Sequence, residues 1–373
     1  MMRDVMGIIN DTDIEHKLKD LTRVRSTAAV PFGGRYRIID FVLSNMANAG
    51  IKNIGILTQS YNRSLLDHVD SGKEWDLLSK RDGLFILPPI FRYDQFTGNL
   101  GDVDHYYNHM DYFTRSRQQY VLISSSNVVY NMDFRDIQQC YEEKQADIVL
   151  VYKNAVTEEN NNFRVLSLLI DNNGRIRDMA ASREKKLSPA VALEIAFMKK
   201  SLFMQIIDDC IARGYRDFTK DGLIKNLEKY RIFGCEHQGF AAKIDSIHTY
   251  YRHSMGLLNP EVWKELFFRH GSIYTKVKDE PPVKYQASAM VSNSLLANGC
   301  HIAGTVENSI LGRGVTVHPG AVVRDSIIMQ KGQIHRGAVV ENAILDKDVV
   351  ITPGKQIRGE KEYPLVVEKQ AVI

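Results

Sequence analysis

Cysteine is scarce in this chain, and the four that are present are spread too widely to form a recognisable framework. They are Cys140, Cys210, Cys235 and Cys300, and no two of them form a C-x-x-C pair. A disulfide scaffold or a zinc site is therefore not expected. We interpret these cysteines as free thiols in a reducing compartment, which predicts a cytoplasmic protein.

The sequence also lacks a strong excess of either charge and any long apolar run. Among 373 residues, 48 are Lys or Arg and 45 are Asp or Glu, which leaves a net charge of +3. This balance does not indicate nucleic acid or an anionic membrane as a partner. No apolar run reaches the length of a membrane span. The short apolar N-terminus soon meets Asp11 and Asp13, which does not fit a signal peptide.

What the first three-quarters of the chain does contain is an alternation of short apolar runs and longer mixed segments. Strands are predicted at 5–9, 53–58, 120–124 and 146–152, and helices at 41–49 and 136–144. This rhythm predicts an α/β fold, with a Rossmann-like domain built on a mostly parallel sheet over residues 1–277. Ligands of such sheets collect at the carboxyl ends of the strands, so the loops after Ile9 and Ser124 are the expected site.

The pattern changes after a polar, proline-containing segment at 278–282, which we interpret as a linker. Apolar residues then recur every six positions, with glycines between them, in two runs: Leu311, Val317, Val323 and Met329, and Val339, Leu345, Ile351 and Ile357. A six-residue period predicts a left-handed parallel β-helix of hexapeptide repeats over 278–373. A β-sandwich with regular turns is the alternative. Because a β-helix has open ends, oligomerisation is expected.

One string of residues is more specific than these periodic patterns. The stretch 31–45, PFGGRYRIIDFVLSN, together with Leu18–Thr22 before it, resembles the ADP-glucose pyrophosphorylases, or glucose-1-phosphate adenylyltransferases. The plainer alternative, a glycine turn before a strand and a helix, explains the glycines but not the polar residues. The resemblance covers the whole chain. It implies a Mg²⁺-dependent enzyme family that makes ADP-glucose from ATP and glucose 1-phosphate for glycogen synthesis.

The chain departs from this family at the positions that handle the nucleotide. Where the family has the glycines of its phosphate loop, this sequence has Thr12, Asp13 and Glu15, and Lys17 replaces the loop arginine. Side chains block the close approach that phosphates need. Each carboxylate near a triphosphate would also repel it by about 4 kcal/mol per close charge pair. Thr27 replaces the family's lysine that meets the phosphates.

The positions implied for metal and sugar are altered as well. Asn127 replaces a Mg²⁺-binding aspartate, and a neutral amide is a poor substitute because Mg²⁺ prefers anionic oxygens. Asp217 matches the second metal-binding aspartate, although a helix N-cap is an equally good interpretation. Lys185 is a remnant of the sugar-phosphate site or a solvated surface charge. Glu194 puts a carboxylate where the sugar would lie.

Arg25 and Arg37 match positions that serve the family's phosphorylated-effector site, whereas Val24 stands where a basic residue is expected. Arginine suits phosphate contacts, but Arg37 pairing with Asp40 is the structural alternative. Taken together, the resemblance and the departures predict a non-catalytic, regulatory subunit. Such a subunit would bind no metal or cofactor itself and would join a catalytic, Mg²⁺-dependent subunit in a hetero-oligomer, expected to be a tetramer.

Two other functions remain open from the sequence. The first is an active sugar nucleotidyltransferase with an atypical site. The second is a hexapeptide acyltransferase, for which His301, His318 and His335 of the predicted β-helix would be the candidate bases. The N-terminal resemblance gives this second alternative little support, and nothing else about these histidines is catalytic in pattern.

Overall fold

The computed structural model describes residues 1–12, 18–58, 63–79, 81–90, 100–154, 165–182 and 188–373. A mixed nine-stranded sheet organises the first domain, in the order β10-β9-β11-β6-β1-β4-β5, with β8 between β11 and β12. Its strands are β1 (Val5–Asn10), β4 (Asn53–Leu57), β5 (Gly83–Leu87), β6 (Tyr120–Ser125), β8 (Ile148–Asn154), β9 (Val165–Ile170), β10 (Ile176–Ser182), β11 (Ala190–Lys199) and β12 (Ile232–Glu236).

The half of the sheet formed by β6, β1, β4 and β5 is parallel, as predicted. Strand β11 then runs antiparallel to β6 and β8, and β9 and β10 continue antiparallel beyond it. The four strands predicted from the sequence correspond to β1, β4, β6 and β8 within two residues at each end. They were recognisable because both faces of these strands are covered, so each strand is an apolar run.

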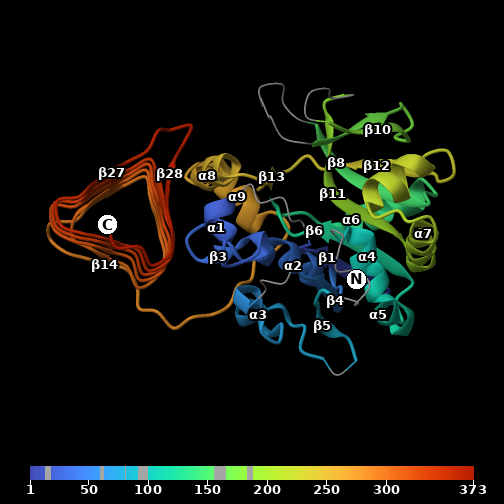
Figure 1. The fold of residues 1–373 in the computed structure, drawn as a ribbon, viewed down its shortest axis with the longest axis horizontal. Coiled ribbons are helices and arrows are strands. Elements are labelled where there is room, and N and C mark those ends of the chain that lie inside the picture. Colours follow the sequence, from blue (N-terminus) through green and yellow to red (C-terminus); the bar gives the residue numbers. More distant parts are fainter. Residues whose placement is uncertain (13–17, 59–62, 80, 91–99, 155–164, 183–187) are drawn as a thin grey trace.

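Helices cover both faces of the sheet (Figure 1). They are α1 (Lys19–Thr22), α2 (Ile38–Ala49), α3 (Arg63–Val69), α4 (Asp102–Asn108), α5 (Met110–Arg115), α6 (Phe134–Glu143), α7 (Lys200–Ala212), α8 (Ile247–Gly256) and α9 (Pro260–Phe268). Helices α2 and α6 bury one core with the sheet, and α4, α5 and α7 bury the other. Two short pairs, β2 (Pro31–Phe32) with β3 (Tyr36–Arg37) and β7 (Val128–Tyr130) with β13 (Ala241–Lys243), complete the domain.

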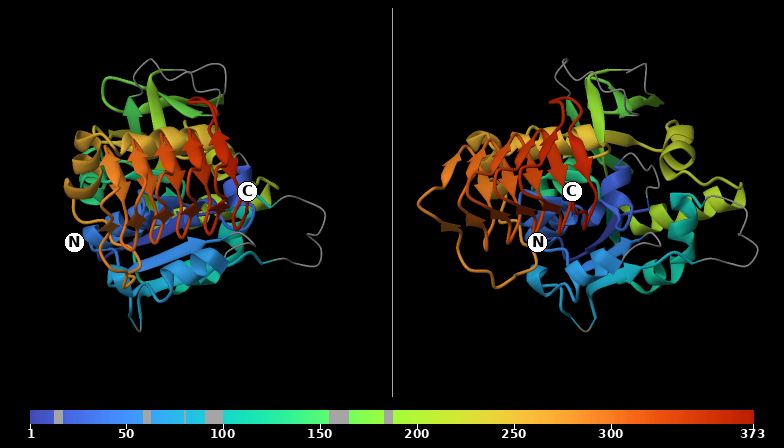
Figure 2. Two further views of the ribbon diagram at one scale, coloured as in Figure 1. Left: turned by 90° about the vertical axis from the view of Figure 1, so that its left-hand side faces the viewer. Right: turned by 60° about the vertical axis from the view of Figure 1, so that its left-hand side comes forward.

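The second domain is a three-sided parallel β-helix whose coils stack beside the first domain (Figure 2). One side holds β14 (Lys284–Tyr285), β17 (His301–Ile302), β20 (Thr316–Val317), β23 (Gln333–Ile334) and β26 (Val350–Ile351). The second holds β15 (Met290–Ser292), β18 (Thr305–Glu307), β21 (Val322–Arg324), β24 (Val339–Glu341) and β27 (Gln356–Arg358). The third holds β16 (Leu295–Leu296), β19 (Ile310–Leu311), β22 (Ile327–Ile328), β25 (Ala343–Leu345) and β28 (Leu365–Val367).

The β-helix is confirmed, but two of the residues predicted to stack inside it are wrong. In the middle of the domain the pairs Val323↔Val340 and Ile328↔Leu345 set a repeat of 17 residues, one fewer than three hexads. One side of each coil is therefore one residue short. Ile328 and Val340, and not the predicted Met329 and Val339, lie in the central stack. Met329 is still buried, but in the cluster between the two domains.

The two domains share an apolar interface. Phe32, Phe41 and Phe267 of the first domain belong to one buried cluster with Met329 and Ile344 of the β-helix. The glycine turn of the 31–45 motif reaches the same place: Gly34 has φ +80°, and a Cβ there would lie 3.3 Å from the carbonyl oxygen of Leu311. The family-like motif therefore contributes to the interdomain junction, and this contact explains why glycine is needed there.

Candidate functional site

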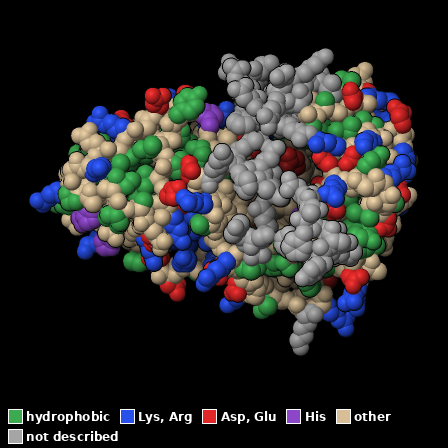
Figure 3. All heavy atoms as spheres, in the orientation of Figure 1, with side chains coloured by type: hydrophobic (Ala, Val, Ile, Leu, Met, Phe, Trp, Pro, Cys, Tyr) green, Lys and Arg blue, Asp and Glu red, His purple; other side chains and the backbone are tan. Residues whose placement is uncertain are grey.

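A cavity of about 620 Å³ lies at the carboxyl ends of β1 and β6, where the sequence predicted the site. Asn10 is the last residue of β1 and Ser125 the last residue of β6. Thr12 and Asn127 follow these two strands, and all four residues line the cavity. Figure 3 shows a hollow on this face in which Asp and Glu side chains are visible. The volume falls within the range of small-molecule sites in proteins.

Five of the residues singled out in the sequence line this cavity: Thr12, Thr27, Asn127, Glu194 and Asp217. Asn127 is buried, its Oδ1 accepts a hydrogen bond from Ser125 Oγ at 2.9 Å, and its carbonyl accepts one from Ile244 N at 2.8 Å. Two other candidates, Lys17 and Lys185, lie outside the described residues, as do the loop residues Asp13 and Glu15.

Asp217 is both a lining residue and a cap. Its Oδ1 accepts a hydrogen bond from Lys220 N at 2.8 Å at the start of the π-helical turn Phe218–Leu223, and its Oδ2 pairs with Lys220 Nζ at 3.0 Å. The N-cap interpretation is therefore realised. The donors at the family's two metal positions are thus a neutral amide and a carboxylate that is already paired. This donor set does not fit Mg²⁺, and no cluster of three or more His, Cys, Asp or Glu suited to a metal occurs within the described ranges.

Asp102, whose importance was not predicted, adds a second carboxylate to the cavity wall. Its Oδ1 accepts hydrogen bonds from Phe218 N at 2.8 Å and Val103 N at 2.9 Å. Burial, with a smaller contribution from the nearby charge of Asp217, raises the pKa of Asp102 to about 7. No sequence pattern signals this shift, because it depends on how tightly α4 and the 217–223 turn close around the carboxyl group.

Glu194 enters the cavity from an unusual backbone position. The pairing of β11 with β8 is irregular between Ala192 and Ile195, and Glu194 in this bulge has φ +57°. That conformation normally favours glycine. Its carboxylate pairs with Lys243 of β13. Glu194, the residue expected to put a carboxylate where the sugar would lie, lines the cavity.

The basic side chains of the cavity are balanced by acidic ones. Among the described lining residues the Lys and Arg side chains are Arg216, Lys220 and Lys243. Each has an acidic partner: Asp104 at 3.8 Å for Arg216, Asp217 for Lys220 and Glu194 for Lys243. A phosphate entering this cavity would have to compete with these carboxylates, which lowers the affinity that the cations alone would give.

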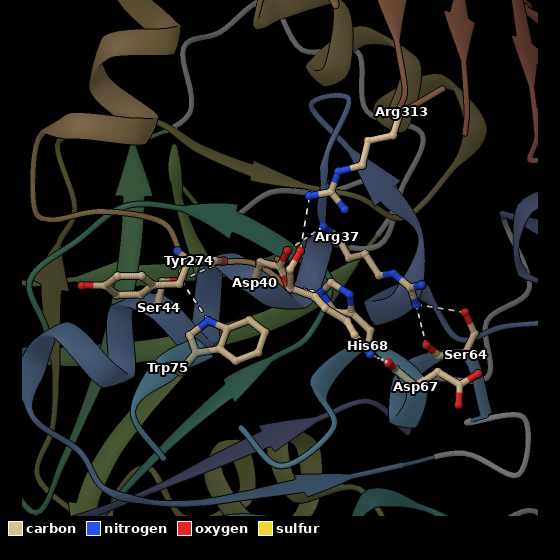
Figure 4. Close-up of polar contacts among 10 residues, drawn as sticks. Arg37, Asp40, Ser44, Ser64, Asp67, His68, Trp75, Tyr274 and Arg313 are labelled. Atoms are coloured by element: carbon tan, nitrogen blue, oxygen red, sulfur yellow. Dashed lines mark hydrogen bonds and ion pairs between the residues drawn. The ribbon is translucent and has the colours of Figure 1, made fainter. Parts of the chain in front are cut away.

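Arg25 and Arg37 do not line the cavity but lie at the interdomain junction. Arg25 is buried and makes two hydrogen bonds to Asp346 of the β-helix, at 2.9 Å and 2.6 Å. This bidentate pair joins the two domains. The Arg37 guanidinium instead donates to the carbonyl and hydroxyl oxygens of Ser64, the latter at 2.9 Å (Figure 4).

The alternative that Arg37 pairs with Asp40 holds for its backbone: Arg37 N donates to Asp40 Oδ2 at 2.9 Å. The other oxygen, Oδ1, lies 2.5 Å from His68 Nε2, and Arg313 of the β-helix points toward the same carboxylate (Figure 4). Burial is the main cause of the lowered pKa of His68. The Asp40 carboxylate on α2 thus contacts His68 of α3 and faces Arg313 of the β-helix.

Five cations gather at this junction: Arg25, Arg37, Lys278, Arg313 and Lys347, which we call the junction basic cluster. Burial lowers the pKa of Lys347 to about 7, with Arg37 and Arg25 contributing repulsion. Burial also lowers the pKa of Arg37 to about 10 and that of Lys278, again with help from neighbouring cations. Mutual repulsion of this kind favours an anion that would neutralise it.

The histidines of the acyltransferase alternative lie on the β-helix and do not line the cavity. His318 and His335 stack with ring centroids 4.6 Å apart, whereas His301 is exposed on β17. In the part of the chain that the structure describes, no helix is both long and apolar enough to cross a membrane.

Comparison with known proteins gives two family matches and many relatives. Residues 16–217 match the nucleotidyl transferase family and residues 281–363 the GlmU-like C-terminal hexapeptide family, consistent with a left-handed β-helix. Over 371 residues the chain is 38% identical to the glycogen biosynthesis protein GlgD of Bacillus subtilis (99% of this chain, 96% of the relative). Identity to GlgD of Geobacillus stearothermophilus is 41% over 372 residues (100% and 98%). Identity to the glucose-1-phosphate adenylyltransferase of Bacillus mycoides is 32% over 360 residues (94% of each).

Proposed function

The chain belongs to the nucleotidyl transferase family, among GlgD proteins and glucose-1-phosphate adenylyltransferases, and we propose that it is a non-catalytic, regulatory subunit of a hetero-oligomeric glucose-1-phosphate adenylyltransferase. Its role would be in glycogen synthesis, where it would modulate the formation of ADP-glucose from ATP and glucose 1-phosphate by a catalytic partner.

The observation that carries this proposal is the state of the cavity. Its size suits a nucleotide sugar, yet Asn127 holds a neutral amide where the family holds a metal-binding aspartate, and Lys220 and Lys243 are paired with acids of the chain itself. Metal-assisted phosphoryl transfer requires cations that neutralise the charge developing on the phosphates. A cavity with a neutral amide at the metal position, and with lysines engaged in ion pairs within the chain, supports loss of catalysis while the fold is kept.

The β-helix supports the expectation of a partner subunit. Its first coil, β14 to β16, forms an edge with exposed apolar side chains, including Tyr285 and Met290. At the opposite end the chain covers the last coil itself, since Ile373 N donates to Val350 O and Thr352 N to Ile373 O. Open strand edges with apolar residues tend to pair with another chain. We propose that the chain pairing with this edge is the catalytic subunit, in a hetero-oligomer.

The junction basic cluster supports regulation by a phosphorylated metabolite. An anion bound among Arg37, Lys278, Arg313 and Lys347 would contact both domains at once, and so favour one interdomain arrangement over another. Couplings between sites of this kind are typically about 1–3 kcal/mol. The Arg25 guanidinium is held by Asp346, so we assign it the role of linking the domains and leave anion contact to the other four.

Mixing tests this function. The purified chain is added to the catalytic adenylyltransferase of the same organism, and ADP-glucose formation is measured with and without a phosphorylated effector. We expect co-purification of the two chains and a change in turnover or effector response. A Lys347→Gln variant should weaken the effector response, whereas the control Arg23→Gln, at an exposed position nearby, should not. If the two chains neither associate nor affect each other's kinetics, the regulatory role is wrong.

A second function, an active nucleotidyltransferase with an atypical site, is favoured by one observation. Asp102 and Asp217 both line the cavity and are close enough for the charge of Asp217 to raise the pKa of Asp102. Two carboxylates in one cavity are a possible starting point for cation binding. Turnover by the chain alone that disappears in Asp217→Ala would establish this alternative.

A further inference from the structure

Two of the four cysteines, which the sequence placed 95 positions apart, meet in the fold. Cys140 lies on α6 and Cys235 on β12, and α6 packs against this strand. Both side chains lie on the face of the sheet that α6 covers, against the same apolar core. There the two sulfur atoms lie within hydrogen-bonding reach of each other. Both residues are only partly buried, unlike the other two cysteines.

The surroundings give the two thiols different properties. The hydrogen bond from Cys235 lowers the pKa of Cys140, opposed by burial and assisted by the charge of Lys144. The same contact and burial raise the pKa of Cys235. Cys140 is therefore the more acidic thiol of the pair and Cys235 the less acidic one. An acidified thiol beside a second thiol is the arrangement found in redox-sensing cysteines.

The other two cysteines provide an internal contrast. Cys210 and Cys300 are buried, and burial raises the pKa of each thiol to about 11. Cys300 also donates its thiol hydrogen to Gly312 O at 3.2 Å. Buried, protonated thiols react slowly with oxidants.

We propose that Cys140 and Cys235 form a peroxide-sensitive dithiol that closes to an intrachain disulfide. The Cys140 thiolate attacks one oxygen of hydrogen peroxide, the O–O bond breaks, and after protonation one water leaves, giving Cys140 sulfenic acid. The Cys235 sulfur then attacks the sulfenic sulfur, the S–S bond forms, the S–O bond breaks, and a second water leaves. The two thiols supply two electrons and two protons, and the peroxide is reduced to two waters.

The disulfide would connect α6 to β12 and enclose the chain between them, which includes β11 and Glu194 of the cavity. Closing such a long loop restricts the unfolded chain, so the oxidised protein should have a higher Tm than the reduced protein. This inference does not depend on the function proposed above.

Mass spectrometry of the full chain tests it. After mild hydrogen peroxide treatment and before alkylation, we expect the intact mass to fall by about 2 Da. We also expect a Cys140–Cys235 linked peptide, with Cys210 and Cys300 still alkylated. In Cys235→Ser, which removes the resolving thiol, Cys140 should be trapped by dimedone as the sulfenic acid. The control Cys210→Ser should form the disulfide as the wild type does.

Two results would overturn the proposal. One is equal loss of all four thiols, or a disulfide involving Cys210 or Cys300. The other is a wild-type chain in which Cys140 and Cys235 stay reduced under peroxide while a thiol-dependent reference protein in the same tube is oxidised. The wild-type measurement decides the matter even if a serine variant fails to fold.

Discussion

The buried ion pair between Arg25 and Asp346 gives the sharpest prediction about how the two domains are held together. Its two charge-assisted hydrogen bonds measure 2.9 Å and 2.6 Å, and the side chains are only 2% and 1% exposed. Removing one partner leaves an uncompensated buried charge, which typically costs about 3–5 kcal/mol. Arg25→Met should therefore destabilise the protein by about that amount, and Asp346→Leu should do the same.

The double variant separates the worth of the pair from the cost of an orphaned charge. Arg25→Met with Asp346→Leu replaces both charges by apolar groups and should recover most of the loss, because the desolvation penalty disappears with the charges. Urea unfolding monitored by tryptophan fluorescence is a suitable assay, since Trp263 packs against the apolar cluster between the two domains.

A matched control lies close by. Arg23 and Glu368 also join the two domains, at 2.7 Å, but their side chains are 68% and 53% exposed. Arg23→Met should cost less than about 1 kcal/mol, because exposed pairs contribute little. If Arg25→Met proved as mild as Arg23→Met, or if the double variant lost the sum of the two single losses, the reasoning about the buried pair would be refuted.

Three further predictions concern the cavity and the junction. The folded pKa of Asp102 is about 7, above its ordinary value, so its contribution to stability falls as pH rises toward and through 7. The free energy of unfolding of Asp102→Asn should therefore exceed that of the wild type by about 1–3 kcal/mol near pH 8, with no such gain near pH 4. Glu194 adopts φ +57°, so Glu194→Gly should change the free energy of unfolding in urea by less than about 1 kcal/mol, whereas Glu194→Val should cost about 1–3 kcal/mol in the same urea assay. Lys347 has a folded pKa of about 7, below its ordinary value, so anion binding should bring proton uptake, and calorimetry should show sulfate binding that strengthens as pH falls from about 9 to 7 and a flatter profile in Lys347→Gln.

The features that could be predicted from the sequence are those set by local patterns of residues, and the features that could not depend on contacts between distant residues. Strands such as β1 and β6 and the position of the cavity were predictable because buried parallel strands are apolar runs and their carboxyl ends share one edge. The β-helix was predictable from its period, yet Met329 was placed in the wrong stack. Counting by six cannot reveal that one side of a coil holds five residues, because that depends on pairing with the neighbouring coil.

The site was predicted as a set of positions and not as a set of contacts. Asn127, Thr27 and Asp217 do line one cavity. The partner of Glu194 is Lys243, 49 residues away in the chain, and that of Arg25 is Asp346, 321 residues away. Such pairs form only when the chain has folded, and burial then sets the pKa shifts.

The most direct test of the proposed function is ADP-glucose synthesis by this chain alone, from ATP and glucose 1-phosphate with saturating Mg²⁺. We expect no product above the uncatalysed background, because Asn127 supplies no charge for the metal and Lys220 and Lys243 are already paired. Turnover comparable with that of the family's catalytic members, abolished by Asp217→Ala, would contradict it.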